Sequence, residues 1–128
     1  EGALKMKEIS YIHAEGYPAG ELKHGPFALL TPETPVVAIA LPGPTYGAMI
    51  SNIKEMKARQ APVIGIGATG DTEIADIVDV FLPLPDGPEP VPLLTSTVIL
   101  QRLAYHTADA LSRDIDRPRN LAKSVTVE

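Results

Sequence analysis

The sequence predicts an α/β domain built as a three-layer sandwich, with a parallel sheet covered by helices on both faces. Three short apolar runs are rich in β-branched residues and bounded by Pro or Gly, and helical patterns separate them. Strands that alternate with helices form parallel sheets of this kind. The predicted strands are Val36–Leu41, Val63–Ile66 and Ile77–Leu82. With 128 residues and 45% hydrophobic content, the chain is large enough for one domain with its own core.

A helix over Tyr46–Arg59 separates the first two strands, and a short helix separates the second from the third. Thr45 is a candidate N-cap of the longer helix. Met49, Ile53 and Met56 recur along it at helical spacing, so we expect these three side chains in the core.

Proline dominates the connection that follows the third strand. Pro83–Pro92 carries a proline at every second or third residue, which excludes regular helix and central strand. The segment leads into a long helix, Leu93–Arg113, that is apolar almost all round as far as Leu103, and we expect it to be buried on more than one side. A sheet of about three strands and a first helix without a cap suggest a piece of a larger protein.

The first helix places a carboxylate inside its apolar face. At about 100° per residue, Glu8 falls within an apolar arc, and Lys5 projects into the same arc one turn earlier. A charge on a packing face is costly unless paired or functional, so Glu8 is either a catalytic candidate or half of a surface Lys–Glu pair. Glu15 shares this face, and the helix should end near it because Pro18 disfavours helix in the preceding residue. The arc holds Leu4, Met6, Ile9, Tyr11 and Ile12, with Lys7, Ser10 and Ala14 on the other face.

Two other residues are candidates because of their surroundings. His24 lies in GELKHGP (20–26), where the glycines and the proline favour a compact turn or short helix that exposes the ring. A loop histidine is more often an ordinary surface residue. Lys123 lies in the tail 117–128, which has too little apolar content to fold by itself, and tail lysines are ordinarily solvated.

Composition excludes several classes of function. The net charge of −5 disfavours binding to nucleic acid or to an anionic membrane. No apolar run approaches the roughly 20 residues that span a bilayer, and the start does not read as a signal peptide, so the cytoplasm is expected. The chain has no cysteine, and His13, His24 and His106 lack metal-ligand spacing. We therefore expect neither a metal nor another cofactor.

The run Gly65–Gly70 matches the dinucleotide fingerprint G-x-G-x-x-G, but the match is weak by itself. Its first glycine falls inside a predicted strand, and Asp71 and Glu73 stand where a pyrophosphate would need free helix N–H groups. We interpret the run as a tight turn after a strand.

Three segments carry a resemblance to a known family: EGALKMKEISYIHAE (1–15), GELKHGP (20–26) and RPRNLAKSVTVE (117–128). They closely resemble the C-terminal part of glucosamine-6-phosphate synthases, the isomerizing glutamine–fructose-6-phosphate aminotransferases. The resemblance implies that residues 1–128 form the second sugar isomerase (SIS) subdomain, with the tail 115–128 folding over the active site. This family makes glucosamine 6-phosphate from fructose 6-phosphate and ammonia derived from glutamine.

The resemblance also implies roles for four residues. Glu8 matches the base that moves a proton between C1 and C2 of the open-chain sugar imine, and Lys5 matches a lysine near the sugar oxygens. Lys123 matches the lysine that engages the ketone carbon as a Schiff base. His24 matches the histidine credited with ring opening, which reaches the site of the neighbouring subunit and implies a homodimer.

The glutaminase domain and the first SIS subdomain, which holds the family's phosphate loop, are expected outside these residues. The segment by itself should therefore bind fructose 6-phosphate or glucosamine 6-phosphate weakly and turn over little. Two alternatives remain open: a glutaminase-free SIS-type deglycase or deaminase of amino-sugar phosphates, and a noncatalytic module that binds a sugar phosphate for regulation.

Overall fold

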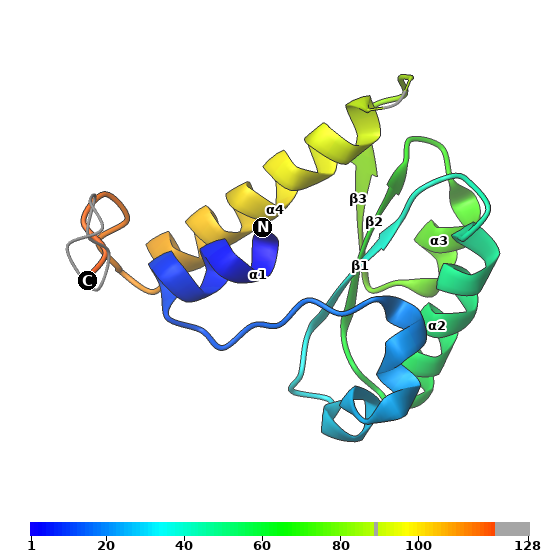
Figure 1. Ribbon diagram of the computed structural model, residues 1–128, viewed down its shortest axis with the longest axis horizontal. Coiled ribbons are helices and arrows are strands. Elements are labelled where there is room, and N and C mark those ends of the chain that lie inside the picture. Colours follow the sequence, from blue (N-terminus) through cyan, green and yellow to red (C-terminus); the bar gives the residue numbers. More distant parts are fainter. Residues whose placement is uncertain (89, 120–128) are drawn as a thin grey trace, which may run out of the picture. The chain divides into compact units, whose positions relative to one another are not determined.

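The computed structural model describes residues 1–88 and 90–119, and the chain divides into two compact units. The first unit combines residues 1–16 with the chain from Thr97 onward, and the second comprises residues 17–96. Each unit is described by itself below, and Figure 1 gives the elements of both.

A parallel sheet of three strands forms the centre of the second unit (Figure 1). The strands are β1 (Val36–Ala40), β2 (Val63–Ala68) and β3 (Val80–Leu84). They pair in the order β1-β2-β3, with Val36 opposite Val63 and Ile64 opposite Val80. The predicted parallel sheet is therefore confirmed. All three strands end at the same edge, which is where loops in such sheets carry functional groups.

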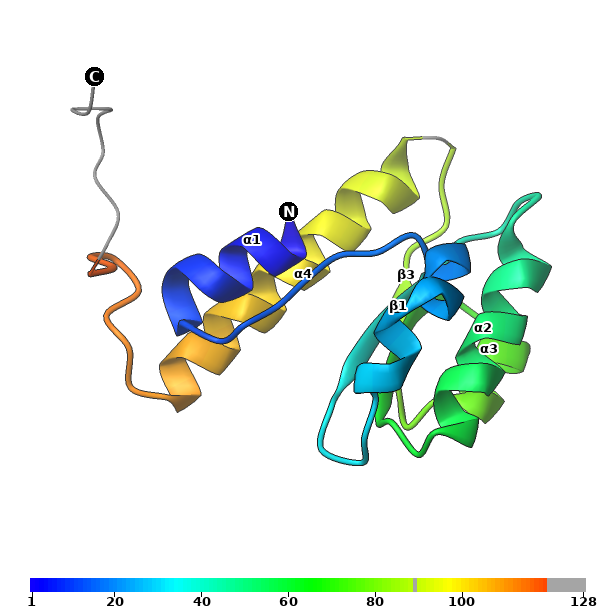
Figure 2. The ribbon, with the colours of Figure 1, turned by 60° about the horizontal axis from the view of Figure 1, so that its bottom comes forward.

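Helices α2 (Tyr46–Ala58) and α3 (Thr72–Ile77) lie side by side on one face of this sheet (Figures 1 and 2). Ile53 and Met56 of α2 are buried, and Met49 packs against the same core, as their spacing predicts. Thr45 is the N-cap residue of α2, but its side chain makes no capping hydrogen bond. The core also contains Phe27, Ala38, Ala40, Ile50, Val63 and Ile74.

Gly65 lets α3 approach β2 closely. A Cβ atom at this position would lie 2.8 Å from Cγ1 of Val78 and 3.0 Å from Cδ1 of Ile74. Gly65 and Gly67 belong to the strand, and Gly70 has a positive φ of 82° in the turn that follows. The predicted tight turn after a strand is confirmed, and close packing explains the first glycine of the run.

The third strand begins at Val80, so the expected start at Ile77 is wrong. Ile77 instead closes α3, and the side chain of Asp79 accepts a 2.6 Å hydrogen bond from the backbone N–H of Val63. Pro83 lies within β3, which is an edge strand and tolerates a residue without a backbone N–H.

The long helix α4 (Val91–Ala110) begins two residues earlier than expected, with Pro92 in its first turn. Proline fits there because the first N–H groups of a helix have no partner inside the helix. The expectation that this helix is buried on more than one side is not met in the described chain. Leu93 is 62% exposed and Leu94 is 61% exposed, whereas the small side chains of Ala104 and Ala108 are buried.

In the first unit, α1 (Gly2–Lys5) continues into a π-helical turn, η1 (Met6–Ser10), and runs beside α4 (Figures 1 and 2). A Cβ atom on Gly2 would lie 2.9 Å from Cβ of Leu100, so the two helices touch closely at this glycine. The helix ends at Ser10, and the expected end near Glu15 is wrong. Tyr11 stops it earlier by adopting a left-handed conformation with φ 64° and ψ 19°.

Candidate active site

Lys5 and Glu8 form a short ion pair on the segment that joins α1 to η1. Nζ of Lys5 lies 2.5 Å from Oε2 of Glu8, and the two side chains are 36% and 25% exposed. The structure thus confirms that these residues meet at i,i+3 spacing. The hydrogen bond to Glu8 raises the pKa of the Lys5 ammonium, which keeps Lys5 protonated at neutral pH. The pair places a carboxylate and a fixed cation side by side.

Glu8 lies in the middle of a π-helical turn, a rare widening of the helix that often occurs at functional sites. The hydroxyl of Ser10 donates a 2.6 Å hydrogen bond to the backbone oxygen of Met6, inside this widened turn. Ser10 is buried, so its placement on the polar face by simple periodicity is wrong. A π turn contains more residues than an α-helical turn, so the side chains after it point in other directions than 3.6-residue periodicity predicts. This explains why Ser10 was placed on the wrong face.

The structure distinguishes between Glu8 and Glu15 as candidate catalytic carboxylates, whereas the sequence pattern placed both on one helix face. Because the helix ends at Ser10, Glu15 lies in the irregular segment beyond it and no longer shares a helix face with Glu8. Glu15 pairs with His13 at 3.6 Å, and both side chains are well exposed. Glu8 thus pairs with the ammonium of Lys5, whereas Glu15 pairs with the imidazole of His13.

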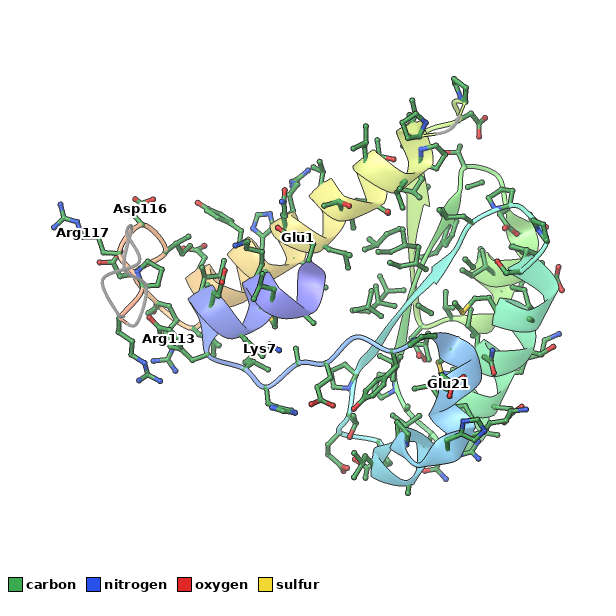
Figure 3. The ribbon with its side chains drawn as sticks, viewed as in Figure 1. Glu1, Lys7, Glu21, Arg113, Asp116 and Arg117 are labelled. Carbon is green, nitrogen blue, oxygen red and sulfur yellow. The ribbon has the colours of Figure 1, made fainter. Side chains whose placement is uncertain are left out.

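Tyr11 connects the end of this helical segment to residues more than a hundred positions later. Its hydroxyl oxygen accepts a 3.0 Å hydrogen bond from the backbone N–H of Arg119. The guanidinium carbon of Arg119 lies 4.1 Å from the centre of the ring, and that of Arg113 lies 5.4 Å from it. Figure 3 shows Arg113 beside the end of the helical segment. Sequence reasoning treated Tyr11 only as an apolar residue, because no local pattern indicates partners so distant in the chain.

His24 ends the 3₁₀ turn η2 (Ala19–His24) of the second unit. Gly25, with φ 145°, separates it from a second 3₁₀ turn, η3 (Pro26–Leu29), which inserts Phe27 into the core. The His24 side chain is 73% exposed, and its Nδ1 lies 2.8 Å from Oε2 of Glu21. The predicted exposed ring in a compact turn is confirmed. Lys123, the remaining candidate, lies outside the described residues.

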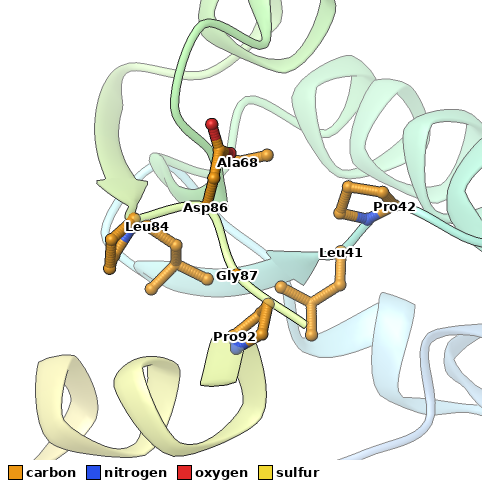
Figure 4. A pocket seen from close by; sticks show the side chains of 8 residues that line it. Leu41, Pro42, Ala68, Leu84, Asp86, Gly87 and Pro92 are labelled. Carbon is orange, nitrogen blue, oxygen red and sulfur yellow. The ribbon is translucent and has the colours of Figure 1, made fainter. Parts of the chain in front are cut away.

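Two hollows open at the carboxyl ends of the strands. The smaller, of about 80 Å³, is mostly apolar and has Asp86 as its one carboxylate (Figure 4). It is far below the 300–1,000 Å³ typical of ligand pockets. The larger, of about 390 Å³, is lined by Tyr46, Asp71 and Glu73 together with Pro42 and Gly43, and its carboxylates would repel a phosphate. Neither hollow is lined by Lys5, Glu8 or His24.

Asp71 occupies the position that a nucleotide phosphate would need. Its Oδ1 accepts hydrogen bonds from the backbone N–H groups of Glu73 (3.1 Å) and Ile74 (3.3 Å), and so caps α3. The hydroxyl of Tyr46 donates to the same oxygen at 2.8 Å. Desolvation and the contact with Asp71 raise the pKa of Tyr46 to about 12, so the phenol stays neutral. The run Gly65–Gly70, which matches the dinucleotide fingerprint, therefore serves to form the strand and its turn and does not form a nucleotide site.

Among residues 1–88 and 90–119, no three His, Asp or Glu side chains gather in a way that could hold a metal ion. The helices of this described part are all too short or too polar to cross a bilayer.

The model of the SIS domain family matches residues 1–109. The chain belongs to the SIS domain family. The match covers the Lys5–Glu8 pair, His24 and the whole sheet, and with the parallel topology it confirms the predicted sugar isomerase fold.

Several relatives match this SIS domain over its entire length. A glutamine–fructose-6-phosphate aminotransferase [isomerizing] of Methanosarcina acetivorans is 63% identical over 128 residues, and that of Thermus thermophilus is 54% identical. In both cases the match covers 100% of the chain and 21% of the relative. The SIS domain thus spans about a fifth of the length of the curated relatives that it matches.

Two solved structures share the fold. The C-terminal domain of glucosamine-fructose-6-phosphate aminotransferase from Francisella tularensis superposes with a TM-score of 0.81 and 39% identity, covering 90% of this chain and 32% of that one. A putative tagatose-6-phosphate ketose/aldose isomerase from Clostridium novyi also gives 0.81, over 99% of this chain and 36% of that one, but with 22% identity. The second likeness concerns the fold alone.

Proposed function

We propose that this SIS domain is the C-terminal part of the isomerase module of a glutamine–fructose-6-phosphate aminotransferase. The relatives that bear this name match from the first residue to the last at 63% identity in one case. The observation in the structure that carries the proposal is the Lys5–Glu8 pair, which sets a carboxylate beside a fixed cation within a π turn. The reaction proposed is the conversion of fructose 6-phosphate and ammonia to glucosamine 6-phosphate.

The proton transfer of this reaction requires one base that serves two neighbouring carbons. In the proposed sequence the amine of Lys123 condenses with the C2 ketone and releases water, and ammonia then displaces the lysine amine to give the C2 imine. Glu8 next removes a proton from C1 of this imine. The electrons of the broken C1–H bond form the C1=C2 bond of an enolamine as the nitrogen takes up a proton. Return of a proton to C2, with loss of the proton of the C1 hydroxyl, then makes C1 the carbonyl and leaves an amine on C2. A carboxylate held by its neighbour can serve both carbons because they are adjacent, and general acid–base catalysis of this kind contributes about 10²–10⁴-fold.

Lys5 is suited to stabilising negative charge and not to forming a Schiff base. Its pKa is raised by the hydrogen bond to Glu8, and a protonated amine is not a nucleophile. A cation beside the base stabilises the charge that develops on the sugar oxygen during proton transfer. We therefore assign the Schiff-base role to Lys123, in the tail 115–128 that we propose folds over the site.

His24 is proposed to open the sugar ring in the active site of a second subunit. Its ring is exposed and is oriented by Glu21, which leaves Nε2 available to a bound molecule. In this proposal the protein is a homodimer, and the glutaminase domain and the phosphate-binding SIS subdomain lie in other parts of the full-length chain.

The test uses the full-length protein with Glu8→Gln and, as the matched control, Glu15→Gln. Glu8→Gln should lower kcat for glucosamine 6-phosphate formation by at least about 10²-fold, the range of a lost general base. Binding of fructose 6-phosphate, measured by calorimetry, should persist. Glu15→Gln should retain the activity of the parent, because Glu15 lies outside the helix in an exposed segment.

The same experiment separates the alternatives. Full activity of Glu8→Gln would refute the assignment of the base, and sugar-phosphate binding without turnover by the parent would indicate a regulatory module. Release of ammonia from glucosamine 6-phosphate, without synthesis from glutamine, would indicate a deaminase.

A further inference from the structure

The hydroxyl of Ser10 is buried in the segment that carries the proposed base. Ser10 is 1% exposed, and its Oγ donates a 2.6 Å hydrogen bond to the backbone oxygen of Met6. The same Oγ accepts a longer hydrogen bond, of 3.4 Å, from the backbone N–H of Ile12. The sulfur of Met6, at 3.2 Å, is a weak second acceptor for the hydroxyl proton. One side chain thus links backbone groups that precede it and follow it in the chain.

These two hydrogen bonds reach both irregular features at the end of the first helix. The bond to Met6 closes the π turn η1, in which Glu8 is the middle residue. The bond from Ile12 reaches across Tyr11, whose left-handed conformation ends the helix. A π turn is rare, and a left-handed tyrosine persists only where its surroundings stabilise it. The Ser10 hydroxyl supplies a contact to each of them.

Ser96 of α4 shows what a buried helical serine does in a regular helix. It is 3% exposed, and its hydroxyl donates to the backbone oxygen of Leu93 at 2.8 Å. A bond of this kind, from a serine to the preceding turn, is common in helices. Ser10 makes such a bond inside a π turn and also accepts the N–H of Ile12, so it joins the turn to the chain that leaves it.

The contact between Lys5 and Glu8 depends on the geometry of this turn. Lys5 is the last residue of α1 and Glu8 lies inside η1, so the pair crosses the boundary between α and π geometry. The Lys5 ammonium fixes the end of the Glu8 side chain, and the Ser10 hydroxyl fixes the backbone that carries it. If the π turn relaxed to α-helical geometry, the Cα–Cβ bond of Glu8 would point in another direction.

We propose that Ser10 is a positioning residue for Glu8, whose hydroxyl holds the π turn so that the carboxylate is aimed at the reacting carbons. The inference rests on the proposed function, because the role of Glu8 as the base belongs to that proposal. The Ser10 hydroxyl bonds to backbone groups, so its effect on Glu8 passes through the turn. Catalysis falls steeply when a catalytic group is misplaced, and a small shift of the turn is therefore enough to slow proton transfer.

The experiment compares Ser10→Ala with the matched control Ser96→Ala in the full-length protein. Both substitutions remove a buried hydroxyl that donates to a backbone oxygen of the preceding turn, but only Ser10 lies in a π turn. Ser10→Thr keeps a hydroxyl and tests for rescue. The kinetic readouts are kcat and KM for fructose 6-phosphate, and the isotope effect on kcat when both C1 hydrogens are deuterium. Amide hydrogen exchange of the peptide 6–12 reports on the turn itself.

Ser10→Ala should accelerate exchange in the peptide 6–12 and lower kcat by about ten- to a hundred-fold, the cost of a misplaced catalytic group, with KM changed less than about two-fold. Each kcat is divided by the fraction of protein that binds fructose 6-phosphate in calorimetry, which removes the effect of partial unfolding. The isotope effect should be at least as large as in the parent, because the slowed step is removal of the C1 proton. Ser10→Thr should recover most of the lost kcat, and Ser96→Ala should match the parent.

Parent-like kcat in Ser10→Ala would overturn the proposal, as would an equal loss in Ser96→Ala or a loss accompanied by a smaller isotope effect. If Ser10→Ala does not fold, Ser10→Cys decides by the same readouts, since a thiol fills the place of the hydroxyl but is a weak donor.

The outcome also separates this inference from the proposed function. An active parent, an impaired Glu8→Gln variant and a parent-like Ser10→Ala variant would leave the proposed function standing and refute the role of Ser10. A parent protein that forms no glucosamine 6-phosphate would refute the proposed function, and the exchange of the peptide 6–12 in Ser10→Ala would then decide whether the hydroxyl holds the turn.

Discussion

Asp71 joins two structural features of the second unit, and its removal is predicted to weaken both. Its Oδ1 caps α3 through the N–H groups of Glu73 and Ile74, and it also accepts the Tyr46 hydroxyl at 2.8 Å. Replacement of an N-cap aspartate by alanine costs about 1 kcal/mol, with a range of about 0.5–2. The lost hydrogen bond of the partly buried phenol adds about 0.5–1.5 kcal/mol. Asp71→Ala should therefore lower the free energy of unfolding by about 2 kcal/mol.

Two further variants separate these contributions. Asp71→Asn retains a good N-cap and should cost less than Asp71→Ala. Tyr46→Phe removes only the hydroxyl and should cost about 1 kcal/mol. In the double variant Tyr46→Phe/Asp71→Ala, the two costs should fall short of additivity by about 1 kcal/mol, because both substitutions remove one shared hydrogen bond.

Urea unfolding followed by far-ultraviolet circular dichroism measures these differences through the transition midpoints. An Asp71→Ala variant within about 0.5 kcal/mol of the parent, which is the spread of ordinary surface substitutions, would refute the capping argument. Full additivity in the double variant would refute the hydrogen bond between Tyr46 and Asp71.

Three further predictions concern packing, pH and assembly. Gly65→Val should destabilise the fold by about 1–3 kcal/mol in the same urea assay, since even a Cβ atom there would lie 2.8 Å from a side-chain carbon; a parent-like midpoint would contradict the close approach of α3 to β2. The ion pair with Lys57 and a backbone N–H lower the pKa of Asp79, so this carboxylate stabilises the fold above its ordinary pKa of about 4 and loses that effect as pH falls through the lowered value. Unfolding midpoints should therefore fall less between pH 7 and pH 3 in Asp79→Asn than in the parent, and equal slopes would refute the assignment. Mixed dimers of His24→Ala and Glu8→Gln full-length subunits should regain activity, because one of their two sites would hold both intact residues; absence of recovery would argue against a site shared between subunits.

Much of the sheet could be predicted because its signals are local. The β-branched runs, the turn glycine at Gly70 and the helical spacing of Ile53 and Met56 all depend on neighbours within a few residues. The boundaries that were wrong depend on tertiary contacts. The side chain of Asp79 accepts a hydrogen bond from the backbone N–H of Val63, and β3 begins only after this contact, at Val80 and not at Ile77.

The candidate site was predictable in part for the same reason. The pairing of Lys5 with Glu8 follows from i,i+3 spacing, which is a property of one helical turn. To decide whether Glu8 or Glu15 is the candidate base, one must know where the first helix ends. Tyr11 ends it by adopting a left-handed conformation. No pattern near Tyr11 indicates that conformation, because its partners lie at Arg113 and Arg119.

The sequence by itself thus determined the order of the strands and helices, the Lys5–Glu8 pair and the exposed turn at His24, because turn chemistry and periodicity act over a few residues. The tertiary structure decided where the first helix stops, and which side chain joins that helix to the chain beyond α4. The second of these features is a contact between residues 108 positions apart, whose energy appears only when the chain has brought them together.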